Sequence, residues 1–266
     1  MHSPRPASND DQNDDQNTAR ESTPSPSIPS VVFPAEQIIG SADLTGPAVA
    51  LPQPPLVALR QSVAFALSAL LSPYLVIPVG TIATVASVAY SRREWLIWTM
   101  LSVFFSTGIP ALYVLIQVWR GKITDLHVME REQRSGPFLV AIFSSAVGAL
   151  LLRSLGANVA IWGIGVVLTI NGIVLFWISS FWKISLHVAV LSSTILAAVV
   201  MIEGISLRNL VWMVPALMWA RVTRKRHTVL QGIGGCVVAC TLTSLILWAL
   251  YSPHVVSVWQ LFLQRI

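Results

Sequence analysis

Charged residues are scarce in this chain, and their scarcity bounds its class. Only 11% of the 266 residues are charged and 54% are hydrophobic, whereas soluble domains typically contain about 25% charged residues. A composition this poor in charge excludes an ordinary soluble domain. It predicts an integral, multi-pass membrane protein, with the plasma or cell membrane as the expected location.

Acidic residues and cysteines are also rare, and this disfavours several kinds of site. No acid lies between Glu132 and Glu203 or after Glu203, so the paired Asp-rich metal motifs of a bundle-type prenyltransferase are missing. The two cysteines, Cys236 and Cys240, lie one helical turn apart in an apolar run, where free cysteine packs as a small hydrophobic residue. No further metal ligands accompany them, and we expect neither a metal nor another cofactor.

The acids that do occur are concentrated at the start of the chain. Residues 1–55 contain seven of the 12 acids and ten of the 16 prolines. A segment so polar and proline-rich buries too little apolar area to offset the entropy of ordering, and it predicts a disordered tail. We expect residues 56–252 to form a membrane bundle and the amphipathic residues 253–266 to lie at the membrane interface.

Long apolar runs fill the rest of the chain and predict an all-α fold of six or seven transmembrane helices. About 20 apolar residues are needed to cross the hydrocarbon core. Pro73 and Pro78 lie in the first run and are expected to kink or split it. The expected spans are residues 61–89, 95–119, 137–154, 157–178, 184–202, 207–220 and 228–250.

Three polar islands interrupt these runs: residues 120–137, 182–187 and 220–235. Two expected spans separate the first island from the second, and two more separate the second from the third. An even number of crossings returns the chain to the same side of the membrane. Hydropathy alone therefore predicts that all three islands lie at one end of the bundle, where they can form one site.

The composition of the islands favours a phosphate site. Arginine binds phosphate oxygens through two parallel hydrogen bonds, and lysine adds a point charge. His187 and His227 each open an apolar helix, close enough to the bilayer that an ionisable group is a functional candidate. Basic loops are also common at cytoplasmic helix ends. For His127, plain solvation explains the residue as well as a functional role does. The island residues concerned are Lys122, Arg131, Arg134, Lys183, Arg221, Arg224, Lys225 and Arg226.

The spacing of the third island resembles a known motif. Arg221 and His227, in "RVTRKRHT", resemble the third motif, Ser-Arg-x5-His-x3-Asp, of the type 2 phosphatidate phosphatase superfamily, the lipid phosphate phosphatases. The segment "ISLH", residues 184–187, resembles the second motif, Pro-Ser-Gly-His. The island that starts near Lys122 and ends in "RSGP" resembles a variant of the first, Lys-x6-Arg-Pro.

The resemblance implies a role for each matching residue. His227 would be the nucleophile that forms a phosphohistidine, and His187 the acid that protonates the leaving oxygen. Gln231 stands where the family has the aspartate that orients the nucleophile. The residues expected to hold the phosphate, without a metal, are Lys122, Arg131 or Arg134, Ser185 and Arg221.

Departures from the motifs leave more than one function open. Gln231 can accept a hydrogen bond from His227 but supplies no negative charge, and in other enzymes loss of an orienting carboxylate costs about four orders of magnitude in rate. The leading expectation is a phosphatase whose partner is a membrane lipid, a lipid phosphate or an isoprenoid diphosphate. No nucleic-acid partner is expected. The alternative is a catalytically silent member that binds anionic lipid, or a small transporter.

Overall fold

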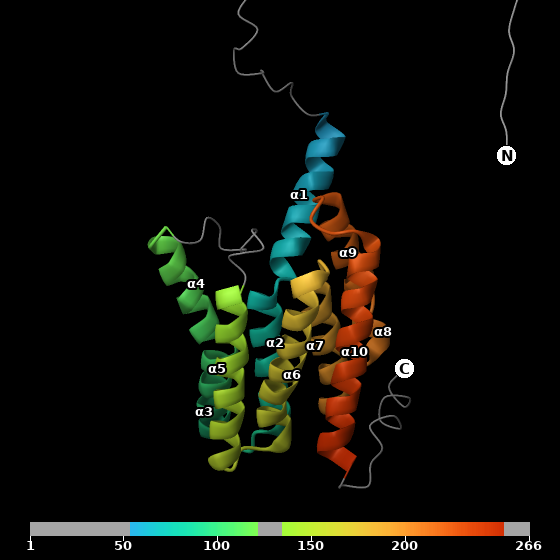
Figure 1. Ribbon diagram of the computed structural model, residues 1–266. Coiled ribbons are helices and arrows are strands. Elements are labelled where there is room, and N and C mark those ends of the chain that lie inside the picture. The colour runs from blue at the N-terminus through green and yellow to red at the C-terminus, as the bar shows by residue number, and fades with distance from the viewer. Residues whose placement is uncertain (1–53, 122–134, 253–266) are drawn as a thin grey trace, which may run out of the picture. The chain divides into compact units, whose positions relative to one another are not determined.

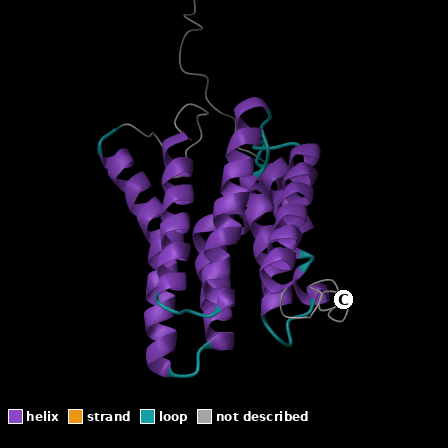
Figure 2. Ribbon diagram, turned by 60° about the horizontal axis from the view of Figure 1, so that its bottom comes forward, coloured by secondary structure: helices purple, strands orange, loops and turns teal. Residues whose placement is uncertain are grey.

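The computed structural model describes residues 54–121 and 135–252, all within the compact unit Pro52–Ile266. Every regular element in these residues is helical, which confirms the all-α prediction (Figures 1 and 2). The expected tail, apart from residues 54 and 55, and the C-terminal interfacial segment lie outside the described residues. The elements are α1 (Pro55–Leu70), α2 (Pro73–Val88), α3 (Arg92–Val103), the π-helix η2 (Phe104–Gly108), α4 (Ile109–Trp119), α5 (Ser135–Ser154), α6 (Val159–Phe181), α7 (Leu186–Met201), α8 (Leu207–Leu210), α9 (Met213–Thr223) and α10 (Val229–Tyr251).

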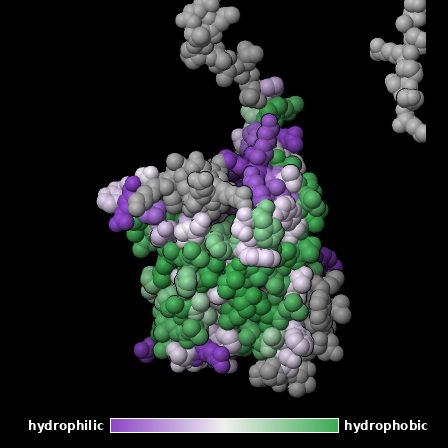
Figure 3. Space-filling model, in the orientation of Figure 1, coloured by the Kyte–Doolittle hydropathy of each residue, from purple (hydrophilic) through white to green (hydrophobic). Residues whose placement is uncertain are grey.

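The long apolar helices are those of a multi-pass membrane protein. Four stretches, Arg92–Trp119, α5, α6 and α10, are long and apolar enough to span a membrane, and α1 with α2 adds a fifth if the bent pair counts as one span. Helix α7 has 16 residues and α9 has 11, fewer than the roughly 20 that a span needs. The described residues therefore show four to five candidate spans, and the expected six or seven would need α7 and α9 to cross as well. Figure 3 shows apolar residues over the middle of one face and hydrophilic ones toward its ends.

The first predicted span is split, as its prolines indicate. Helix α1 ends at Leu70, α2 begins at Pro73, and the two helices are bent by 45°. Ser72 has an extended backbone with ψ of 153°, because the ring of a following proline disfavours the helical conformation. Pro73 occupies the first helical turn, where its missing N–H costs nothing. Pro78 lies inside α2 without ending it.

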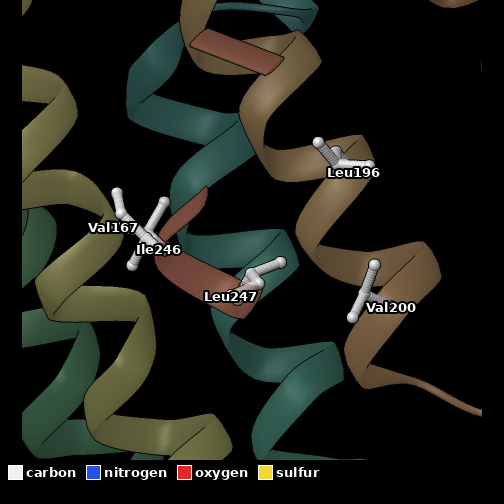
Figure 4. Packing of buried hydrophobic residues seen from close by; sticks show 5 residues of the cluster. All are labelled: Val167, Leu196, Val200, Ile246 and Leu247. Atoms are coloured by element: carbon white, nitrogen blue, oxygen red, sulfur yellow. The ribbon is translucent and has the colours of Figure 1, made fainter. Parts of the chain in front are cut away.

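Helices α6, α7 and α10 pack against one another. Figure 4 shows one cluster of their buried side chains, in which Ile246 and Leu247 of α10 lie between Val167 of α6 and the pair Leu196 and Val200 of α7. These five side chains are buried, with at most 8% exposure. Helix α6 is fixed at its start by Asn158, whose side chain accepts a hydrogen bond from the backbone N–H of Ala160. Such an N-cap satisfies one of the donors that a helix leaves unpaired.

Glycines allow the closest approaches between helices. A Cβ on Gly165 of α6 would lie 2.9 Å from the Cβ of Ala149 and 3.0 Å from the carbonyl oxygen of Ser145, both on α5. A Cβ on Gly235 of α10 would lie 2.7 Å from the carbonyl oxygen of Ser185, at the start of α7. Small residues at interfaces are typical of membrane helices, because they let backbones pack closely.

The positions of the helix ends agree with the prediction from hydropathy that the three islands lie at one end of the bundle. The end of α4 and the starts of α5, α7 and α10 all lie toward the end of the bundle where α1 stands (Figure 1). The backbone N–H of Ser185 in the second island donates to the carbonyl oxygen of Gln231 in the third island, 3.2 Å away. The prediction that these two islands meet is therefore confirmed. Most of the first island, residues 122–134, lies outside the described residues.

A substitution at Gly235 tests the closest of these approaches. We expect Gly235→Ala to lower the free energy of unfolding by about 1–3 kcal/mol, because the new methyl group would press on a backbone oxygen that has little room to move. Thermal unfolding of the purified protein in detergent measures this. The matched control is Gly163→Ala on α6, where the added methyl would meet only the side-chain ends of Leu250 and Met201 at 3.2 and 3.5 Å. Equal loss in both variants would contradict the prediction.

Candidate functional site

Within the third island, a tight turn joins α9 to α10. The backbone N–H of Arg226 donates to the carbonyl oxygen of Arg221 at 3.0 Å, and that of Lys225 donates to Val222 at 2.9 Å. This pair of bonds defines a Schellman motif, in which the residue after the C-cap adopts a left-handed conformation. Lys225 occupies that position with φ of 53°, where glycine is more usual. The turn brings His227 next to the last turn of α9, which contains Arg221.

A capping box starts α10 and also holds His227. The hydroxyl of Thr228 accepts from the backbone N–H of Gln231, and Oε1 of Gln231 accepts from the backbone N–H of Thr228. The same Oε1 lies 3.1 Å from Nδ1 of His227. Glutamine at this position therefore satisfies the first turn of the helix and contacts the histidine at once.

This contact defines the tautomer of His227. The atom of Gln231 that receives the backbone N–H must be the carbonyl oxygen, because a backbone N–H only donates. An amide oxygen only accepts, so Nδ1 of His227 must be the nitrogen that donates to it. In the neutral ring the lone pair then lies on Nε2. Gln231 thus sets the tautomer that makes Nε2 basic.

The start of α7 lies against the start of α10. Ser185, its N-cap, is fully buried, and Oγ has no hydrogen-bond partner among the described residues. The first N–H groups of a helix have no partner within it and form the positive end of its dipole. A buried serine hydroxyl beside such groups favours an anion at this end of α7.

Three of the predicted site residues face one cavity of about 250 Å³. His187 of α7, Arg221 of α9 and His227 of the turn all line it. Most of the remaining lining is apolar and comes from α2, α4, α5, α6 and α7. The cavity therefore joins a basic, histidine-containing end to an apolar interior. Ser185 does not line the cavity but precedes His187 by two residues. Gln231 does not line the cavity either, but it contacts His227, which does.

Helix α1 forms part of the surroundings of Arg221. The hydroxyl of Ser68 lies 3.5 Å from Nη1 of Arg221 and accepts from it. The guanidinium of Arg224 lies over the ring of Phe65, 4.9 Å from the centroid, a cation–π distance. The side-chain amide of Gln61 donates to the carbonyl oxygen of Thr223 at the end of α9. The sequence does not predict these contacts of α1 with α9, because an apolar helix with isolated Ser and Gln residues carries no signal for them.

The other candidate residues lie elsewhere. Lys122, Arg131, Arg134 and His127 fall in residues 122–134, outside the described part of the chain. Lys183 and Lys225 are exposed and do not line the cavity. Within residues 54–121 and 135–252, no three His, Cys, Asp or Glu side chains are grouped so that they could hold a metal ion.

Comparison of the chain with family models, with curated proteins and with solved structures finds no match in any of the three.

Two substitutions separate the capping role of Gln231 from its contact with His227. Thr228→Ala and Gln231→Ala each remove part of the capping box, and we expect each to lower the free energy of unfolding by about 1 kcal/mol. Only Gln231→Ala removes the acceptor for His227 Nδ1, so only this variant should change the rate at which His227 reacts with diethyl pyrocarbonate. Thermal unfolding and mass spectrometry of the modified histidine measure the two effects. The same reactivity in both variants would contradict the assigned role of Gln231.

Proposed function

We propose that this protein is a metal-independent membrane phosphatase that hydrolyses a lipid phosphate or an isoprenoid diphosphate through a phosphohistidine. The observation that supports this most is the shared cavity of His187, Arg221 and His227, in which the contact with Gln231 leaves Nε2 of His227 basic. The proposal includes the resemblance to the lipid phosphate phosphatases, a location in the cell membrane, and six or seven crossings in which α7 and α9 also cross.

The reaction proceeds in two displacements. Nε2 of His227 attacks phosphorus, the bond between phosphorus and the lipid oxygen breaks, and His187 gives a proton to the departing oxygen. A water molecule then loses a proton to His187 and attacks the phosphohistidine. The bond from phosphorus to His227 breaks, inorganic phosphate leaves, and both histidines return to their starting states.

Positive groups stabilise the negative charge on the phosphoryl oxygens. Arg221 supplies a guanidinium from the end of α9, and the start of α7 supplies backbone N–H groups beside Ser185. By resemblance, Lys122 and either Arg131 or Arg134 complete the set from the first island. Arg221 and the N–H groups of α7 are held in place by the helix ends that carry them, so they need little reorganisation during the reaction.

The cavity suits a substrate with an apolar chain. Its basic end is formed at the helix ends, while its interior is lined by residues such as Ile77, Ile142 and Leu168. A lipid phosphate can therefore place its headgroup against Arg221 and His227 and its chain among the helices. Burial of apolar chain area contributes about 25 cal/mol per Å² to such binding.

A second candidate function follows from Gln231. An amide orients His227 but adds no negative charge to stabilise the imidazolium that forms when the ring loses its lone pair to phosphorus. A protein with this substitution can bind an anionic lipid in the same cavity without turning it over. This silent lipid-binding protein is the alternative to the phosphatase.

Measurement of phosphate release tests the proposal, and also tests whether His227 is required while Lys225 is not. Purified protein in detergent with EDTA is given phosphatidate, phosphatidylglycerol phosphate or a polyprenyl diphosphate. We expect release from at least one lipid and none above background from His227→Ala, because the nucleophile is gone. The matched control is Lys225→Asn, which removes a neighbouring cation and suits the left-handed backbone, and it should retain activity within about threefold. Release that survives in His227→Ala would contradict the phosphohistidine. Absence of release from every lipid would favour the silent protein.

A carboxylate at residue 231 tests whether the missing charge limits the rate. Gln231→Glu keeps the length needed for the capping box and adds a negative charge beside His227. We expect phosphate release to rise by about tenfold or more, in the direction of the effect of orienting carboxylates elsewhere. Gln231→Leu, which has no acceptor, should instead lose activity. An unchanged rate in the glutamate variant would show that charge at this position is not limiting.

A further inference from the structure

The cavity has a second polar region that the phosphate chemistry does not use. Ser106 and Thr107 of η2, Asn171 of α6 and Ser193 of α7 line it together. Ser193 follows His187 by six residues on the same helix, which corresponds to about 9 Å along the axis. We call these four residues the inner polar site, since they lie among the apolar lining and away from the helix ends.

Asn171 has an unused acceptor. Its amide nitrogen donates to the carbonyl oxygen of Val167 at 3.0 Å and to the hydroxyl of Thr243 at 3.1 Å. A carbonyl oxygen only accepts, so this atom must be the nitrogen, and both of its protons are used. The remaining atom, Oδ1, is buried and has no hydrogen-bond partner among the described residues. Asn171 as a whole is only 5% exposed.

Thr243 and Ser193 hold Asn171 in this orientation. Their hydroxyl groups lie 2.8 Å apart, so Asn171, Thr243 and Ser193 form one buried network across α6, α10 and α7. A buried amide locked by two hydrogen bonds cannot turn to satisfy Oδ1 from within the network. A buried polar atom without a partner is destabilising, so a donor from outside would be bound favourably.

The π-helix supplies hydroxyl groups on another wall of the cavity. Ser106 and Thr107 lie within Phe104–Gly108, and their buried hydroxyl oxygens have no hydrogen-bond partner in the described chain. Single π-turns inside helices occur often at functional sites. A hydroxyl group can both donate and accept, so these side chains can complement a ligand of either kind.

We propose that the inner polar site binds a hydroxyl group carried on the apolar chain of a lipid. In this proposal, such a hydroxyl donates to Oδ1 of Asn171 and accepts from Ser106 or Thr107, whose residues line the same cavity. The surrounding apolar lining takes the chain on either side of it. The inference rests on the proposed function only in placing a phosphate at the other end of the cavity, and it narrows the substrate to lipids with a polar group within the chain.

Binding of non-hydrolysable alkylphosphonates tests this directly. The probes share one chain length and carry no hydroxyl, a hydroxyl next to the phosphonate, one near the middle of the chain, or one at its end. Dissociation constants come from the concentration dependence of the unfolding temperature in detergent. We expect the mid-chain hydroxyl to bind about tenfold more tightly than the plain chain. Equal binding of all four probes would overturn the proposal and leave the inner polar site to water alone.

Variants show which residues are responsible. Asn171→Leu should abolish the preference for the mid-chain hydroxyl while leaving affinity for the plain chain within about twofold. Because this variant also breaks the network with Thr243, Ser106→Ala is a second test, with the preference falling by about threefold. The matched control is Ser102→Ala, which removes a buried hydroxyl one turn earlier that does not line this cavity. A preference that survives in both cavity variants would overturn the proposal.

The phosphonate readout separates this inference from the proposed function. Binding does not require turnover, so a protein that releases no phosphate but prefers the mid-chain hydroxyl would disprove the phosphatase and support the inner polar site. A protein that hydrolyses lipid phosphates but binds the four probes equally would support the phosphatase and disprove the inner polar site.

Discussion

The close approach of α7 and α10 is the constraint on which the rest of the site depends. The start of α10 can reach the start of α7 because Gly235 has no side chain to separate it from the backbone of Ser185. A hydrogen bond from Ser185 to Gln231 then joins the two helix starts. Because Gln231 also contacts His227, the position of the turn, the tautomer of its histidine and the start of α7 are set by one local packing arrangement.

Much of the helical architecture could be predicted from hydropathy. Apolar runs long enough to be spans gave α5, α6 and α10 to within a few residues, and Pro73 gave the split between α1 and α2. The number of spans could not be predicted, because hydropathy does not register where a helix begins. Helix α7 starts only at Leu186, and α9 is preceded by the separate short helix α8, so both are shorter than their apolar runs.

That His187, Arg221 and His227 lie at the same end of the bundle could be predicted as well, from the order of the apolar runs and polar islands along the chain. Their contacts could not. The hydrogen bond from Arg221 to Ser68 joins residues 153 positions apart, and no local pattern marks that pairing. Asn171 did carry a signal, since an amide inside an apolar run is costly unless it is paired, but its partner Thr243 lies 72 positions away.

The amide at residue 231, in place of a carboxylate, affects how the site behaves at low pH. A carboxylate that orients a histidine picks up a proton as the medium becomes acidic, and it then ceases to act as a pure acceptor. The amide of Gln231 does not titrate, so its oxygen accepts from Thr228 and from Nδ1 of His227 at any physiological acidity. Because residue 231 takes up no proton, acidification cannot change the geometry of this turn through that side chain.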